Sequence, residues 1–222
     1  MKPHILLLST ILLLLTGCAL ERQGLLPELT PAAEMNKKSR CAAVFPVGKW
    51  QFVHAIDFTM GNGAGTGLIG VTSLNGNDIE CALITVEGLT LFEAALSEDN
   101  DLKIRRSVPP FDNLRFAEGL MHDLQTLFLP PSAKHVKSGL THGTNEVCRY
   151  IDSNGKVTDI LPELDNCWQI NIYNSNMTLN RSITGRSCKD QGAGRIPGYL
   201  ELNSYGTNRY KLKMTLIRAD KI

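Results

Sequence analysis

The stretch that decides the fold is residues 50–58, which read Trp50-Gln51-Phe52-Val53-His54-Ala55-Ile56-Asp57-Phe58. Its even-numbered positions carry large apolar side chains and one histidine, whereas its odd-numbered positions carry glutamine, valine, alanine and aspartate. A repeat of two residues is typical of a β-strand that turns one face toward the interior. The stretch therefore predicts a strand with an apolar inner face. On that face we expect His54 to be a hydrogen-bonded core residue rather than a ligand.

Further antiparallel strands are expected on both sides of this one. A glycine-rich turn over residues 60–67, which matches no phosphate-binding motif, leads to a strand over residues 68–72. Asn75-Gly76 then signals a β-hairpin. The other predicted strands cover residues 79–86, 89–96, 146–151, 156–160, 168–172, 180–185, 199–205 and 209–217. An antiparallel sheet of this size is expected to curl.

The middle of the chain predicts a helix. Proline pairs at 109–110 and 130–131 bound it, and Asp112 is a candidate N-cap. Large apolar residues recur between the prolines at helical spacing, namely Phe116, Leu120, Leu124 and Leu127. This stripe must be buried against the sheet. A second, short helix is expected over residues 131–140. The fold class is therefore mainly β, with a curved antiparallel sheet crossed by a helix.

The inward-facing apolar residues allow two interpretations. They form either a tightly packed core or the wall of a cavity that admits an acyl chain, with the central helix closing it. Both arrangements need the same apolar faces, so the pattern leaves the alternatives open. The candidate cavity residues are Trp50, Phe52, Ile56, Phe116, Leu120, Leu124, Trp168, Ile170, Leu212 and Met214.

The amino-terminal segment predicts export. Lys2 precedes an apolar run over residues 5–15, which is too short to span a bilayer comfortably. The following Leu15-Thr16-Gly17-Cys18 resembles the lipobox of bacterial lipoproteins, which implies cleavage after residue 17 and a lipid on Cys18. Residues 18–40 are then expected to be a flexible tether, and residues 41–222 the folded domain.

Charge and cysteine content narrow the classes of function. The formal net charge is only +1, which gives no reason to expect nucleic acid as a partner. The cysteines after Cys18 are five in number, at positions 41, 81, 148, 167 and 188. In an oxidising periplasm they can form disulfides, and their odd number leaves at least one outside intrachain pairs. Their connectivity stays open. No spacing fits a zinc site, and no metal or cofactor is expected.

No catalytic constellation is predicted. His122 and Asp123 adjoin on the central helix, but adjacent helical residues do not face each other. His135 and His142 accompany no nucleophile motif. We therefore expect a binding protein rather than an enzyme.

Two stretches carry a resemblance to a known family. Residues 196–202, with Gly206 and residues 209–214, resemble the closing hairpin of the LolA/LolB superfamily, and residues 71–84 resemble its third and fourth strands. The chain is most similar to LolB-related outer-membrane lipoproteins. The resemblance implies an unclosed half-barrel with a helical lid over a cavity for acyl chains. It also implies that Leu74 is an exposed turn leucine that enters the membrane.

The resulting hypothesis is a lipoprotein that faces the periplasm and binds an acyl chain of a lipid or lipoprotein during envelope assembly. Its expected partners are the membrane, reached through the anchor, and a periplasmic carrier or assembly protein. Ala19 after the lipidated cysteine favours the outer membrane, with the inner membrane as the alternative. The alternative function is that of a structural or assembly lipoprotein with a filled core, which acts through protein contacts.

Overall fold

The computed structural model describes residues 24–31, 41–109, 111–141, 145–162, 167–190, 195–206 and 209–222. The predicted signal peptide, the predicted lipid site at Cys18 and most of the predicted tether lie outside these residues, as does His142.

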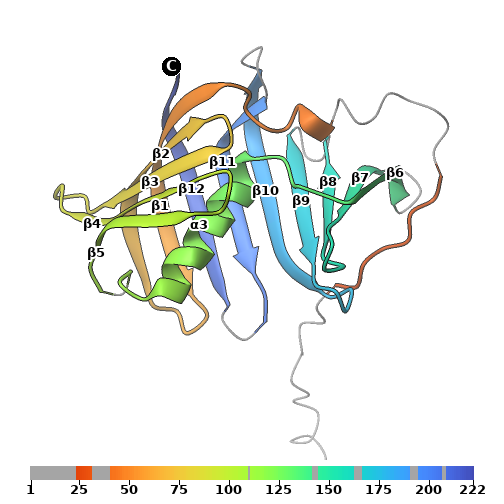
Figure 1. Cartoon of the computed structure of the whole chain (residues 1–222), viewed down its shortest axis with the longest axis horizontal. Coiled ribbons are helices and arrows are strands. Elements are labelled where there is room, and N and C mark those ends of the chain that lie inside the picture. Colours follow the sequence, from red (N-terminus) through yellow and green to blue (C-terminus); the bar gives the residue numbers. More distant parts are fainter. Residues whose placement is uncertain are drawn as a thin grey trace, which may run out of the picture.

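The described residues form one large antiparallel sheet and one central helix (Figure 1). The strands are β1 (Lys49–Met60), β2 (Gly65–Asn75), β3 (Asp78–Ile84), β4 (Thr90–Leu96), β5 (Leu102–Ser107), β6 (His135–Thr141), β7 (Asn145–Ile151), β8 (Val157–Leu161), β9 (Trp168–Tyr173), β10 (Leu179–Asp190), β11 (Arg195–Ser204) and β12 (Tyr210–Lys221). The helix is α3 (Leu114–Phe128).

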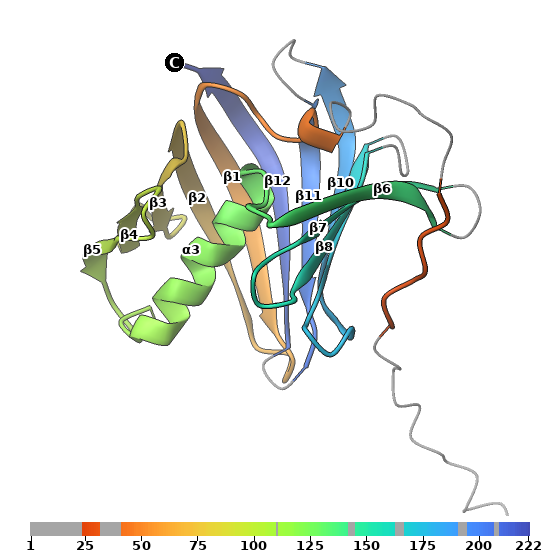
Figure 2. The ribbon, with the colours of Figure 1, turned by 45° about the vertical axis from the view of Figure 1, so that its right-hand side comes forward.

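The sheet is curved but not closed into a barrel. Its order is β5-β4-β3-β2-β1-β12-β11-β10-β9-β8-β7-β6, so β5 and β6 are its two free edges. Figure 2 shows that the sheet bends around α3, which runs across the concave face. The predicted half-barrel with a helical lid is therefore confirmed.

The helix begins and ends where local chemistry requires. Asn113, not the predicted Asp112, is the N-cap, because its side-chain oxygen accepts hydrogen bonds from the backbone N–H groups of Arg115 and Phe116. The helix ends at Phe128, just before the proline pair at 130–131. The second helix expected over residues 131–140 is wrong, since β6 occupies most of that range.

The inner face of the sheet is solidly packed at one end. The rings of Trp50 and Phe52 stack with their centroids 5.6 Å apart, and those of Phe52 and Phe128 stack at 5.1 Å. Trp168 and Ile170 are also fully buried there. The carboxyl-terminal end of α3 is thus fixed to the sheet by aromatic packing.

Two disulfides link distant parts of the chain. Cys41 is bonded to Cys148, and Cys167 to Cys188. Cys81 is buried and unpaired, in agreement with the odd number predicted. The first disulfide ties the segment before β1 to β7, which lies near the far edge of the sheet.

Part of the predicted tether is bound to the folded domain. Within residues 24–31, Leu25 bridges to Thr178 and Thr30 bridges to Leu140. Arg149 forms a bidentate ion pair with the buried carboxylate of Asp159. It also donates a hydrogen bond to the backbone carbonyl oxygen of Pro27, at 2.9 Å. The described part of the chain holds no helix that is long and apolar enough to cross a membrane.

Candidate functional site

A cavity of about 1180 Å³ lies between α3 and the concave face of the sheet. Ligand pockets in proteins commonly measure roughly 300–1,000 Å³, so the space is large enough for a long hydrophobic molecule. Its walls come from α3 and from the inner faces of β1, β2, β3 and β12. One end of β10 and one end of β11 complete the wall. The apolar residues of the wall include Ile56, Phe58, Leu68, Leu83, Phe111, Phe116, Leu120, Leu124, Leu212 and Met214.

Six of the ten candidate cavity residues predicted from sequence line this space. They are Ile56, Phe116, Leu120, Leu124, Leu212 and Met214. The other four, Trp50, Phe52, Trp168 and Ile170, belong to the packed core at the opposite end of the sheet. For the candidates on strands, the period-two pattern correctly identified the face that turns inward. It could not tell where the helix packs closely against that face and where a void remains.

The void depends on small side chains on the inner faces of β2 and β3. Gly70, Thr72 and Cys81 line it, where larger residues would fill it. A Cβ atom at Gly70 would lie only 2.4 Å from Cδ1 of Ile56. These residues were missed by sequence reasoning because their effect depends on the strand register, which pairs Thr72 with Cys81.

Aromatic side chains cluster between the amino-terminal half of α3 and the sheet. Phe116 meets Phe111 and Phe58 edge to face, with centroids 5.4 and 6.3 Å apart. The ring of Phe58 also lies 5.7 Å from that of Tyr210. Phe111, Phe116 and Tyr210 all line the cavity, so aromatic surface forms part of its wall.

The inner face changes from apolar to polar in a single step. The strand register aligns Phe58, Leu212, Leu202 and Ile183 across β1, β12, β11 and β10 in an apolar row. Two residues further along each strand, the register aligns four other residues in the same order: Met60, Tyr210, Ser204 and Arg181. We call this second set the polar row, because three of its four residues are polar; all four line the cavity.

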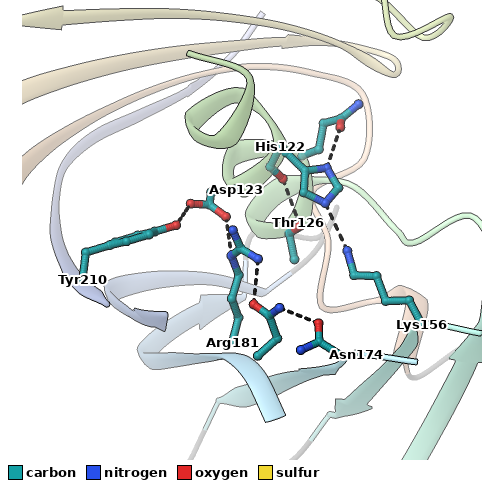
Figure 3. A network of polar contacts seen from close by, with 9 residues as sticks. His122, Asp123, Thr126, Lys156, Asn174, Arg181 and Tyr210 are labelled. Carbon is teal, nitrogen blue, oxygen red and sulfur yellow. Dashed lines mark hydrogen bonds and ion pairs between the residues drawn. The ribbon is translucent and has the colours of Figure 1, made fainter. Parts of the chain in front are cut away.

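Asp123 of α3 meets the polar row. One of its carboxylate oxygens lies 2.7 Å from Nε of Arg181, and the hydroxyl of Tyr210 donates to the other (Figure 3). Burial raises the pKa of Asp123, while the Arg181 charge and the Tyr210 hydrogen bond act in the opposite direction. Burial also raises the pKa of Tyr210. The cluster joins the lid to two strands.

His122 and Asp123 point to different partners, as predicted from their adjacent positions (Figure 3). His122 lies 3.1 Å from Nζ of Lys156 and 3.4 Å from the amide oxygen of Gln125. Burial and the charge of Lys156 lower the pKa of His122. The neutral ring can therefore accept a hydrogen bond from Lys156, and the pair gives a contact between α3 and the segment before β8.

His54 is a core residue, as expected, although it differs from the expectation in one respect. Its ring packs beside Phe52 and Phe128, and burial lowers its pKa to about 4. However, its Nδ1 atom has no hydrogen-bond partner among the described residues. His54 is therefore neutral at physiological pH.

Two other predicted features were the glycine-rich turn and the exposed leucine at position 74. The turn predicted over residues 60–67 is a shorter hairpin turn over residues 61–64, next to which the N–H of Met60 donates to the carbonyl of Ala64, because Met60 belongs to β1 and residues 65–67 belong to β2. The expectation of an exposed turn leucine at Leu74 is wrong, because Leu74 pairs with Ile79 inside the hairpin and is only 3% exposed. Within the described ranges no group of three or more His, Cys, Asp or Glu residues could hold a metal ion.

Comparison with known proteins gives a likeness in fold. No family model matches the chain, and no curated protein sequence does. A LolA superfamily protein from Nitrosomonas europaea has a similar structure, with a TM-score of 0.58 at 8% identity over 86% of this chain and 94% of that one. The chain therefore has the fold of the LolA superfamily, as the sequence resemblance implied.

Two further structures are less similar. One is described as an outer membrane lipoprotein-sorting protein domain from Vibrio parahaemolyticus, with a TM-score of 0.47 at 8% identity over 83% of this chain and 89% of that one. The other is a DUF1329 family protein from Desulfovibrio piger, with a TM-score of 0.48 at 7% identity over 82% and 89%. The fold assignment rests on the first comparison alone.

Proposed function

We propose that this protein binds the acyl chain of a lipid or lipoprotein in the cavity beneath α3, and that it accepts, holds or passes on that cargo in the cell envelope. The observation that carries the proposal is the cavity of about 1180 Å³ with its largely apolar wall. An apolar chain that covers this wall removes apolar surface from water, which favours binding.

The energy available for binding is sufficient. Each methylene group removed from water contributes ~0.8 kcal/mol, so a chain of ten methylenes gains up to about 8 kcal/mol before the entropic cost of binding. Phe116, Leu120 and Leu124 of α3 cover the cavity on one side, and Leu212 and Met214 form part of its floor. Binding needs no bond to be made or broken, so the proposed role is that of a carrier or acceptor rather than of an enzyme.

The proposed location is the periplasmic face of the outer membrane, with the protein anchored by a lipid on Cys18. Two disulfides support an oxidising compartment, because such bonds persist outside the reducing cytoplasm. The lipobox-like residues 15–18 support lipidation. A periplasmic carrier that delivers the cargo is the expected protein partner.

The test is uptake of a fluorescent fatty acid by the exported protein carrying Cys18→Ser, stripped of bound lipid. We expect saturable binding at micromolar concentration. Leu124→Arg, which puts a charge into the cavity wall, should abolish it, whereas Leu114→Arg at an exposed position of the same helix should not. Absence of uptake by the parent protein, together with co-purification of envelope proteins without lipid, would favour the structural alternative.

A further inference from the structure

We propose that the cavity is specific for an amphiphile with a negatively charged head group, a carboxylate or a phosphate, which Arg181 and Ser204 bind. This inference rests on the proposed function and adds the chemical class of the ligand. It comes from the polar row, which the apolar pattern of the sequence did not reveal.

Arg181 has hydrogen-bonding capacity that the protein does not use. A guanidinium group carries five N–H donors. Nε faces Asp123, and Nη1 donates to the side-chain oxygen of Asn180 at 3.0 Å. The hydroxyl of Tyr210 is a third hydrogen-bond partner of the guanidinium group, so three partners share its five N–H donors. The side chain is 19% exposed and lines the cavity, so an oxygen atom of a ligand can reach an N–H group that these partners leave unused.

Ser204 supplies a second donor beside the first. It is the register partner of Arg181 in the β10–β11 ladder, and both residues line the cavity. Side chains that are directly opposite in an antiparallel pair have Cβ atoms about 4.5–5.5 Å apart, which suits two contacts to one carboxylate or phosphate. The Ser204 hydroxyl makes no hydrogen bond with another described residue.

The charges of the wall favour an anion. The cavity is lined by three arginines, Arg115, Arg181 and Arg209, and by a single acid, Asp123. The lining therefore holds more positive than negative side chains, which favours a negatively charged head group over a cationic one.

The order of the rows fixes how the ligand lies. The polar row lies at one end of the inner face of β1, β12, β11 and β10, and the adjacent row toward the middle of these strands is apolar. With its head group at Arg181 and Ser204, the ligand would extend its tail toward Leu212, Ile56 and Leu83. A neutral head group could accept a hydrogen bond there, but it would lack the charge that strengthens a hydrogen bond to a guanidinium group.

The experiment compares ligands that share one tail. Dodecanoate, dodecyl phosphate and dodecanol compete with a neutral fluorescent reporter for the full exported chain carrying Cys18→Ser, at a pH at which the carboxylate is ionised. We expect at least one anion to bind tenfold or more tightly than dodecanol, because a hydrogen bond to a charged group is stronger than one between neutral groups. Whether the carboxylate or the phosphate binds more tightly identifies the head group.

Variants separate the head-group contacts from the fold. Ser204→Ala and Arg181→Lys should each reduce the ratio of anion affinity to dodecanol affinity several-fold, and Arg181→Lys keeps a positive charge beside Asp123. Lys213→Gln is the matched control, since it removes a charge from an exposed position on β12. Equal affinity for dodecanol and both anions would overturn this inference and leave the proposed function standing. Failure of all three ligands to bind would overturn the proposed function itself.

Discussion

Gly119 allows a direct test of whether the cavity is the working part of the molecule. It lies on α3 and lines the cavity, and a Cβ atom at this position would meet no heavy atom within 4 Å, apart from the helix's own backbone. Gly119→Leu therefore places a side chain of four carbons in open space. If it displaces three methylene groups of an acyl chain at ~0.8 kcal/mol each, the affinity falls by about 2.4 kcal/mol, or roughly 50-fold in Kd.

Two measurements on this variant decide the question. Titration with a fluorescent fatty acid gives Kd, and thermal unfolding gives Tm. Leucine is a better helix former than glycine by up to about 1 kcal/mol, so Tm should stay level or rise. Gly119→Ala is the control, because it gains the same helical propensity and hardly changes the cavity. A fall in Tm of the size produced by overpacking, together with unchanged uptake, would mean that this space is filled in solution and would refute the reasoning.

Three further predictions concern stability. Because burial lowers the pKa of His54 from 6.5 to about 4, the unfolded chain takes up the proton first as the pH falls. The free energy of unfolding should then fall by roughly 3 kcal/mol between pH 6.5 and 4, and urea titrations of His54→Gln should lack that part of the change. Removing the disulfide by Cys41→Ser and Cys148→Ser should lower the free energy of unfolding by roughly 2–5 kcal/mol, because it opens a link across 107 residues. Asp159→Ala should cost roughly 3–5 kcal/mol by leaving Arg149 buried without its partner, and limited proteolysis should show faster cleavage within residues 24–31.

The sequence predicted the fold where side chains alternate strongly. The strand at residues 50–58 and the helix between the proline pairs were found because one face of each is apolar and the other is not. The edge strands β5 and β6 were missed for a physical reason. None of the side chains of β5 is fully buried, and β6 buries only two of its seven residues, so neither needs the apolar alternation that marks a central strand.

The site was predictable only in part, because a void is not a property of any one segment. Residue type tells which face turns inward, and so Ile56, Leu212 and Met214 were identified. The space beside them depends on Gly70 and on the path of α3, which sequence patterns do not encode. The Asp123–Arg181 pair was also missed, since its members are 58 residues apart in the sequence and meet only because α3 packs against the sheet next to β10.

The two ends of α3 are held against the sheet by different kinds of contact. This difference explains how the protein can maintain a cavity. At the carboxyl-terminal end, Phe128 stacks on the sheet and Leu127 is buried, so close packing supplies stability there. Over the rest of the helix, where the cavity lies, the helix is held against the strands by the ring contacts of Phe116 and by the polar contacts of Asp123 with Arg181 and Tyr210. Such directional contacts fix the position of a helix without filling the space beneath it. In the proposed function, a ligand would enter and leave the cavity while the packed end keeps the lid attached.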